Sequence, residues 1–154
     1  MIKAVIFDFD YTLGDSTNGI FISINYALEQ LGYAAGKSDD IKNTIGLSLK
    51  ETYFALTGNR DLAEAEQFAL LFKEKADEVM LDNTQLYTGV KEVLQQLKEK
   101  GYKTAIVTTK FHYRIEQILS KYEAKELIDI IVGAEDVREE KPNPEGLLYA
   151  ATQL

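Results

Sequence analysis

The chain has 154 residues, of which 45% are hydrophobic and 27% are charged. These fractions are typical of a globular protein and exclude a disordered or fibrous chain. The net charge of −8 argues against a nucleic-acid or membrane-surface partner, because both attract an excess of Lys and Arg. With no cysteine, no apolar stretch long enough to span a bilayer and no export signal, we expect a cytoplasmic protein without disulfides or thiolate metal sites.

Three short runs rich in β-branched residues predict buried strands. They cover residues 2–7, 103–108 and 128–132, and their nearly continuous apolar character suits strands covered on both faces. Helices are predicted over residues 89–100 and 113–119, where apolar side chains recur at helical spacing. This alternation of helix and strand predicts an α/β fold with a Rossmann-like parallel sheet, connected by right-handed crossovers.

The segment that follows the first strand contains helical signals only. Ser48 opens a capping-box pattern, and residues 60–80 are rich in strong helix formers. We therefore predict an all-helical cap over residues 15–85. It is inserted into a core domain built from residues 1–14 and 86–154.

Polar side chains stand after the predicted strands. In chain order they are Asp8, Asp10, Thr108, Thr109, Lys110 and Lys141. Ligands of parallel α/β sheets bind beyond the carboxyl ends of the strands, so we expect these side chains to share one crevice. A carboxylate nucleophile close to hydroxyl groups and an ammonium group suits phosphoryl transfer through an aspartyl phosphate.

The residue types also suggest which part of the phosphoryl transfer each side chain would carry out. A phosphate dianion approaching Asp8 is repelled by about 4 kcal/mol per charge pair at 4 Å. Lys141 and a bound Mg²⁺, with Asp8 as a ligand, would supply the opposing charge. Thr108 would hold the transferring oxygens. Asp10 would protonate the leaving alcohol and later deprotonate the attacking water.

These motifs resemble those of the haloacid dehalogenase (HAD)-like hydrolases. Residues 7–13 (FDFDYTL) resemble the first motif, residues 106–110 (IVTTK) the second, and Lys141 the third. The segments 12–32 and 86–90 are most similar to the phosphoglycolate phosphatase branch, whose cap is helical. The resemblance covers nearly the whole chain, and its three motifs follow the expected strands in the expected order.

The resemblance implies a Mg²⁺-dependent phosphatase that acts on a small phosphomonoester. Asp8 would be the nucleophile that carries the phosphoryl group and a metal ligand. Asp10 would be the acid/base, and its backbone carbonyl would bind the metal. The implied phosphate-binding residues are Thr12, Thr108, Thr109 and Lys141.

Three features depart from the family pattern. Tyr11 stands where most members of this branch have Gly, and the presence of Asp10 disfavours dehalogenation. The acidic fourth motif is not found, because the chain ends 13 residues after Lys141. We therefore expect the C-terminal strands of the core to be missing and residues 4–7 to form an exposed sheet edge. Such a chain would be a truncated piece, or would rely on a partner or a swapped strand.

Other interpretations remain open at this level. A phosphomutase would share both aspartates but return the phosphoryl group to a sugar, and an inactive or regulatory module would keep the fold without turnover. A response-regulator receiver also places acidic residues and Lys at strand ends, but it lacks a large helical insert. We expect His112 at a helix start and the acidic residues of 135–140 on a solvated surface. Whether the chain is a monomer or a homodimer is left open.

Overall fold

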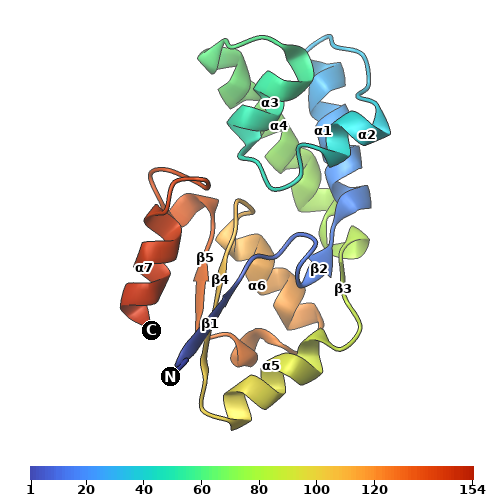
Figure 1. Ribbon diagram of the computed structural model, residues 1–154. Coiled ribbons are helices and arrows are strands. Elements are labelled where there is room, and N and C mark those ends of the chain that lie inside the picture. The colour runs from blue at the N-terminus through green and yellow to red at the C-terminus, as the bar shows by residue number, and fades with distance from the viewer. The chain divides into compact units, whose positions relative to one another are not determined.

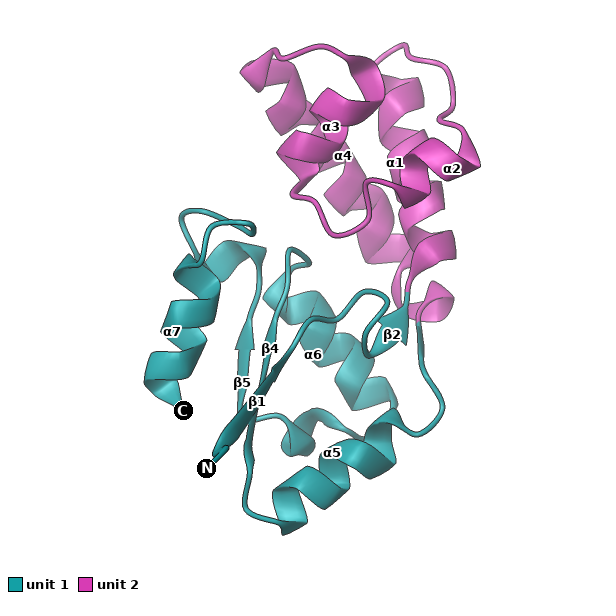
Figure 2. Ribbon diagram, in the orientation of Figure 1, with its two compact units in different colours: residues 1–15, 85–154 teal, residues 16–84 magenta.

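The computed structural model describes residues 1–154, which divide into two compact units (Figure 2). The core unit comprises residues 1–15 and 85–154, and the helical unit comprises residues 16–84. All strands lie in the core unit, whereas the helical unit contains helices alone. The prediction of an α/β fold is confirmed.

A three-stranded parallel sheet forms the centre of the core unit. Its strands are β1 (Ala4–Phe7), β4 (Lys103–Val107) and β5 (Ile130–Val132), in the order β1-β4-β5. The central strand is buried from Thr104 onward, whereas all four residues of β1 are only half-buried. The predicted edge position of residues 4–7 is therefore confirmed. The third strand is shorter than predicted, because its ladder with β4 begins only at Ile130.

Helices cover both faces of this sheet (Figure 1). Helices α5 (Val90–Glu99) and α6 (His112–Lys121) lie on one face, and α7 (Glu145–Gln153) lies on the other. Gly146 allows α7 to approach closely, because a Cβ atom there would lie 3.1 Å from Cγ1 of Val107. Two faces covered by helices explain the nearly continuous apolar character of the strands.

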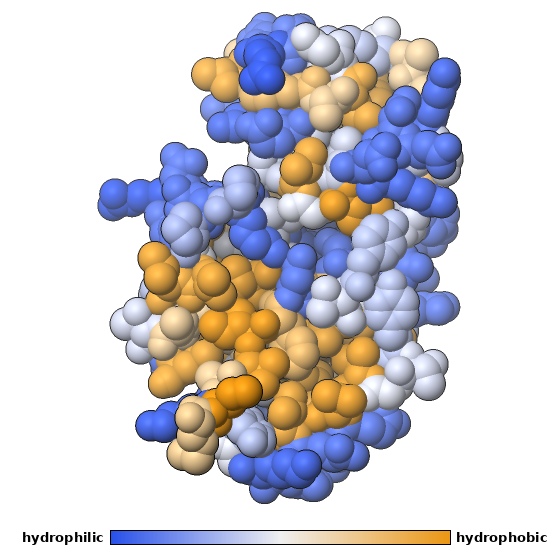
Figure 3. Space-filling model, in the orientation of Figure 1, coloured by the Kyte–Doolittle hydropathy of each residue, from blue (hydrophilic) through white to orange (hydrophobic).

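Apolar side chains remain exposed on one part of the core unit. Figure 3 shows them gathered over the region of β1 and α7. Ile2 is 72% exposed, Leu147 49% and Leu148 61%. This surface adjoins the sheet edge formed by β1.

A short ribbon and three 3₁₀ turns complete the secondary structure between the main elements. Strands β2 (Gly14–Asp15) and β3 (Gln85–Leu86) pair antiparallel, with Gly14 opposite Leu86. They bring together the two points at which the chain passes from one unit to the other. The 3₁₀ turns are η1 (Leu81–Asn83), η2 (Lys125–Leu127) and η3 (Ala134–Asp136).

The helical unit is built from four α-helices around an apolar core. They are α1 (Thr17–Gln30), α2 (Ser38–Lys42), α3 (Leu49–Thr57) and α4 (Leu62–Val79). As the capping-box pattern predicts, Ser48 precedes α3 and its Oγ accepts a hydrogen bond from Glu51 N at 3.2 Å. The largest side chains of this core are Ile20, Ile24, Leu28, Ile41, Tyr53, Phe68, Phe72 and Met80. None of the chain's helices combines the length and the hydropathy needed to cross a bilayer.

Candidate active site

A tight turn after β1 positions the two aspartates. The carbonyl of Phe9 accepts hydrogen bonds from three consecutive backbone amides, those of Thr12 (3.0 Å), Leu13 (2.9 Å) and Gly14 (3.2 Å). Gly14 packs against the ring of Phe9 so closely that a Cβ atom would lie 2.7 Å from Cζ. The turn therefore holds Asp8 and Asp10 at the carboxyl end of the strand.

Tyr11 adopts an unusual backbone conformation within this turn. Its φ is 62°, in the left-handed region, where a residue with a Cβ atom is disfavoured by about 1 kcal/mol or more. The amide of Tyr11 donates to the carbonyl of Gly14 at 2.9 Å, which helps to hold this conformation. A positive φ is the conformation that Gly adopts most readily, and Tyr11 occupies it without opening the turn.

Asp8 and Lys141 form the first of two ion pairs at the carboxyl ends of the strands. Oδ1 of Asp8 lies 2.9 Å from Nζ of Lys141 and accepts a hydrogen bond from Phe9 N at 2.7 Å. Lys141 Nζ also donates to the carbonyl of Val107, the last residue of β4, at 3.0 Å. The side chains of Asp8 and Lys141 are 43% and 33% exposed. Lys141 thus links the ends of two strands beside a carboxylate that a substrate can reach.

Thr108 continues this arrangement at the end of β4. Its backbone amide donates to Val132 at 3.0 Å, and its buried Oγ1 accepts from Lys110 N at 3.0 Å. The hydroxyl hydrogen can therefore still be donated to a phosphate oxygen. Thr109 is half-buried, whereas Thr12 is exposed and its side chain makes no hydrogen bond in the site. Of the three threonines, Thr108 is the one that is buried and whose hydroxyl group is held by Lys110 N, so its position supports a role in the site best.

Asp10 and Lys110 form the second ion pair, which is buried. Lys110 Nζ lies 3.4 Å from Oδ1 of Asp10, and this oxygen makes no hydrogen bond. The sequence places Lys110 at the end of a strand but assigns it no role. Its position directly after two threonines at the carboxyl end of β4 is the signal that could have included it.

His112 connects two acidic residues of the core unit. Its Nδ1 lies 2.7 Å from Asp136 Oδ2, and its Nε2 lies 3.1 Å from Glu116 Oε1. Partial burial lowers the pKa of His112, but the hydrogen bonds and charges of Asp136 and Glu116 outweigh this and leave the pKa raised. As expected, His112 is the first residue of a helix, α6.

The acidic segment 135–140 is more structural than expected. Glu135 accepts a hydrogen bond from the backbone amide of His112 at the start of α6, and Asp136 also accepts from Gly133 N at 2.8 Å. Glu135 and Asp136 are exposed, as expected, but they also accept hydrogen bonds that hold the start of α6. Long-range packing of η3 against α6 created these contacts, and the local sequence did not reveal it.

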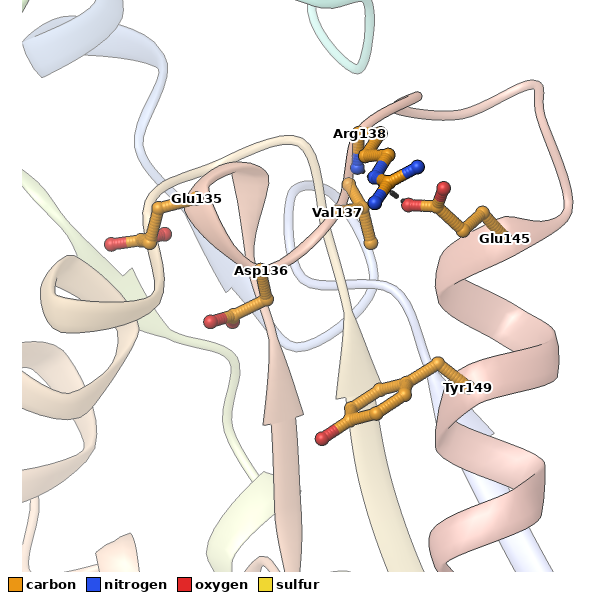
Figure 4. Close-up of a pocket in the computed structure, with 6 residues that line it drawn as sticks. All are labelled: Glu135, Asp136, Val137, Arg138, Glu145 and Tyr149. Atoms are coloured by element: carbon orange, nitrogen blue, oxygen red, sulfur yellow. Dashed lines mark hydrogen bonds between the residues drawn. The ribbon is translucent and has the colours of Figure 1, made fainter.

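Two pockets lie in the core unit. The first, of about 290 Å³, adjoins the first ion pair. It is lined by Ile6, Phe7, Asp8, Val107, Lys141, Pro142, Asn143, Pro144 and Leu147. The second, of about 350 Å³, is lined by Glu135, Asp136, Val137, Arg138, Glu145 and Tyr149 (Figure 4). Glu145 there accepts from the backbone amide of Arg138 at 2.6 Å. Only the first pocket includes the predicted chemical groups.

The oxygen donors of the site suit a hard cation with few protein ligands. Asp8 and Asp10 stand on one turn, and the Asp8 carboxylate is 43% exposed at the end of β1. No group of three or more His, Cys, Asp or Glu side chains is arranged around a common point. Mg²⁺ is commonly held by one or two carboxylates together with water and substrate phosphate, so these residues fit Mg²⁺.

Residues 5–154 match the family described as haloacid dehalogenase-like hydrolase. The chain belongs to the haloacid dehalogenase-like hydrolases. The resemblance that the three motifs indicated is thereby confirmed, and this chain is a hydrolase of that family.

Relatives of this hydrolase extend the comparison. Pyrophosphatase PpaX from Bacillus mycoides (strain KBAB4) is 31% identical over 153 residues, which span 99% of the chain and 69% of the relative. A haloacid dehalogenase-like hydrolase from Bacteroides fragilis superimposes with a TM-score of 0.95 at 39% identity, covering 99% of this chain and 73% of that one. A predicted phosphoglycolate phosphatase from Haemophilus somnus 129pt superimposes with a TM-score of 0.82 at 28% identity, covering 99% of this chain and 71% of that one. These findings support a phosphatase within the family.

Proposed function

We propose that this hydrolase is a Mg²⁺-dependent phosphatase of small phosphate esters or anhydrides, with Asp8 as the nucleophile. The observation that carries the proposal is the contact of 2.9 Å between Asp8 Oδ1 and Lys141 Nζ. It places an ammonium group beside the carboxylate, where it offsets the repulsion of an incoming phosphate dianion. The relatives support the phosphate chemistry, since one is a pyrophosphatase and another a predicted phosphoglycolate phosphatase.

The proposed reaction has two displacements at phosphorus. In the first, a carboxylate oxygen of Asp8 attacks phosphorus, the bond from phosphorus to the leaving oxygen breaks, and Asp10 gives that oxygen a proton. In the second, Asp10 takes a proton from water and the water oxygen attacks the aspartyl phosphate. The bond from phosphorus to Asp8 then breaks, inorganic phosphate leaves, and both carboxyl groups return to their starting states.

The other residues bind and position the substrate. Lys141 and the Thr108 hydroxyl would hold the transferring oxygens, with Thr109 and Thr12 as further candidate phosphate contacts. The Asp8 carboxylate and the Asp10 backbone carbonyl would hold Mg²⁺, whose charge would neutralise the phosphoryl oxygens. The buried position of Thr108 and its contact with Lys110 N support a preorganised phosphate site.

Substitution of Asp8 tests the proposal directly. Asp8→Asn keeps the shape of the side chain but removes the nucleophile, and we expect turnover of p-nitrophenyl phosphate with Mg²⁺ to fall by about a thousandfold or more. Asp39→Asn, on an exposed position of α2, is the matched control and should retain full turnover. Circular dichroism checks that both variants fold.

Two results would contradict the proposal. One is turnover that persists unchanged in Asp8→Asn, and the other is the absence of turnover in the unsubstituted chain, as an inactive module would show. The phosphomutase alternative is separated by the product, because a phosphatase releases inorganic phosphate whereas a mutase returns the phosphoryl group to a sugar.

A further inference from the structure

The ion pair of Lys110 and Asp10 is buried, and one oxygen of Asp10 is not fully satisfied. The two side chains are 6% and 10% exposed, and Nζ and Oδ1 are 3.4 Å apart. The same Oδ1 makes no hydrogen bond. Removing two charges from water is costly, and a buried pair offsets that cost only when good hydrogen bonds satisfy both groups. On the Asp10 side of this pair, one carboxylate oxygen therefore remains without a hydrogen bond.

The backbone of Lys110 is held on both sides. Its amide donates to Oγ1 of Thr108 at 3.0 Å, and its carbonyl accepts from Ala134 N at 3.0 Å. These bonds tie the loop after β4 to the segment after β5. The ammonium group is therefore presented from a fixed loop beside Asp10, two residues from the expected phosphate ligand.

The two lysines of the site pair with different carboxylates. Lys141 contacts Asp8, the proposed nucleophile, and Lys110 contacts Asp10, the proposed acid. Nucleophile and leaving group lie on opposite sides of phosphorus in an in-line displacement. The leaving oxygen must come within hydrogen-bond distance of Asp10 to receive a proton, so groups attached to it lie beside Lys110.

We propose that Lys110 binds a negatively charged group on the leaving side of the substrate, and so selects phosphoanhydrides such as inorganic pyrophosphate over esters with uncharged leaving groups. This inference rests on the proposed phosphatase function. In a chain with a net charge of −8, a second phosphate next to Asp10, which becomes a carboxylate once it has protonated the leaving oxygen, needs a local cation to be tolerated. Lys110 is the cation placed there.

The test compares two substrates across three variants. Lys110→Met keeps the length of the side chain and removes its charge, and Lys110→Arg keeps the charge. We expect Lys110→Met to lower the ratio of kcat/KM for pyrophosphate to kcat/KM for p-nitrophenyl phosphate by about tenfold to a hundredfold. Lys110→Arg should restore most of the ratio. The control Lys103→Met changes a lysine that is 62% exposed at the opposite end of β4, and should leave the ratio unchanged.

A binding measurement makes the test independent of turnover and of the variants' folding. Calorimetry of the unsubstituted chain with methylenediphosphonate and with phenylphosphonate compares a charged and an uncharged leaving side, and we expect at least about tenfold tighter binding of the former. Equal affinity for the two ligands, or a kcat/KM ratio unchanged in Lys110→Met, would overturn the role of Lys110. If the unsubstituted chain hydrolysed and bound neither class of compound, the phosphatase proposal itself would fail, and the role of Lys110 with it.

Discussion

The two units of the chain bury polar groups in different ways. In the helical unit, every buried polar residue is a serine or threonine, and most of their hydroxyl groups bond to a nearby backbone carbonyl. Those residues are Ser16, Ser23, Thr44, Ser48, Thr52 and Thr84. In the core unit, the buried polar residues include two charged ones, Lys110 and Arg114. Neutral hydroxyl groups satisfied by the adjacent helical turn are inexpensive to bury, whereas a buried charge requires a partner.

This difference separates structural polar groups from candidate functional ones. A hydroxyl that returns its hydrogen bond to the preceding turn, such as that of Thr52 to the Ser48 carbonyl at 2.9 Å, is satisfied within its own helix. A charge at the carboxyl end of a strand finds its partner on another element, as Lys110 does with Asp10. We therefore expect substitutions in the helical unit to change stability, and those at the strand ends to change turnover.

The largest expected effect on stability lies in the helical unit. Phe68 on α4 is fully buried and contacts the ring of Tyr53, so Phe68→Ala should lower the free energy of unfolding by about 3–5 kcal/mol. Leu70→Ala, on the same helix but 68% exposed, should cost far less. Urea unfolding measures both variants. Equal losses would show that the apolar core of this unit is not what stabilises it.

The largest expected effect in the core unit, apart from that of Asp8, is on turnover. Lys141→Met should lower kcat/KM for p-nitrophenyl phosphate by about a hundredfold to a thousandfold, because the charge beside the proposed nucleophile Asp8 is lost. The free energy of unfolding should change little, since the side chain is 33% exposed. Steady-state kinetics and urea unfolding on one preparation give both values. A Lys141→Met variant that lost stability but kept its turnover would contradict the expectation that substitutions at the strand ends change turnover and not stability.

A pair of isosteric substitutions compares one hydroxyl from each unit. Thr52→Val should lower the free energy of unfolding by about 1 kcal/mol and leave turnover unchanged. Thr108→Val should lower turnover by about tenfold or more, because it removes the proposed phosphate contact and the acceptor for Lys110 N. If both variants affected only stability, the Thr108 hydroxyl would be structural like that of Thr52.

The smallest expected effect concerns the pH dependence of stability. The carboxylates of Asp136 and Glu116 raise the pKa of His112 above its usual value near 6.5, and Lys125, paired with Glu116, is the nearby cation. The stabilisation by protonated His112 is therefore complete below about pH 6.5 and disappears as the pH rises through the raised pKa. His112→Gln should destabilise the chain at pH 5.5 more than at pH 9 in urea unfolding. If His112→Gln lowered the free energy of unfolding by the same amount at both pH values, the charge of His112 would make no contribution to stability.

Much of the fold could be predicted from local patterns. The strands at residues 4–7 and 103–107, the absence of strands from the helical unit and the cap at Ser48 follow from composition and spacing over a few residues. The predicted elements were least accurate at their ends, as at Ile130, because the partner strand decides where a ladder begins.

The sequence by itself determined the family, the fold class and the residues Asp8, Asp10, Thr108 and Lys141 at the ends of strands, because motifs and periodicity are local properties of a chain. Only the tertiary structure decided which charges meet. It paired Lys141 with Asp8 and Lys110 with Asp10, and it made the exposed residues Glu135 and Asp136 partners of His112. These pairings join segments up to 133 residues apart in a sequence of 154, and only the packing of parallel strands and their helices brings such segments together.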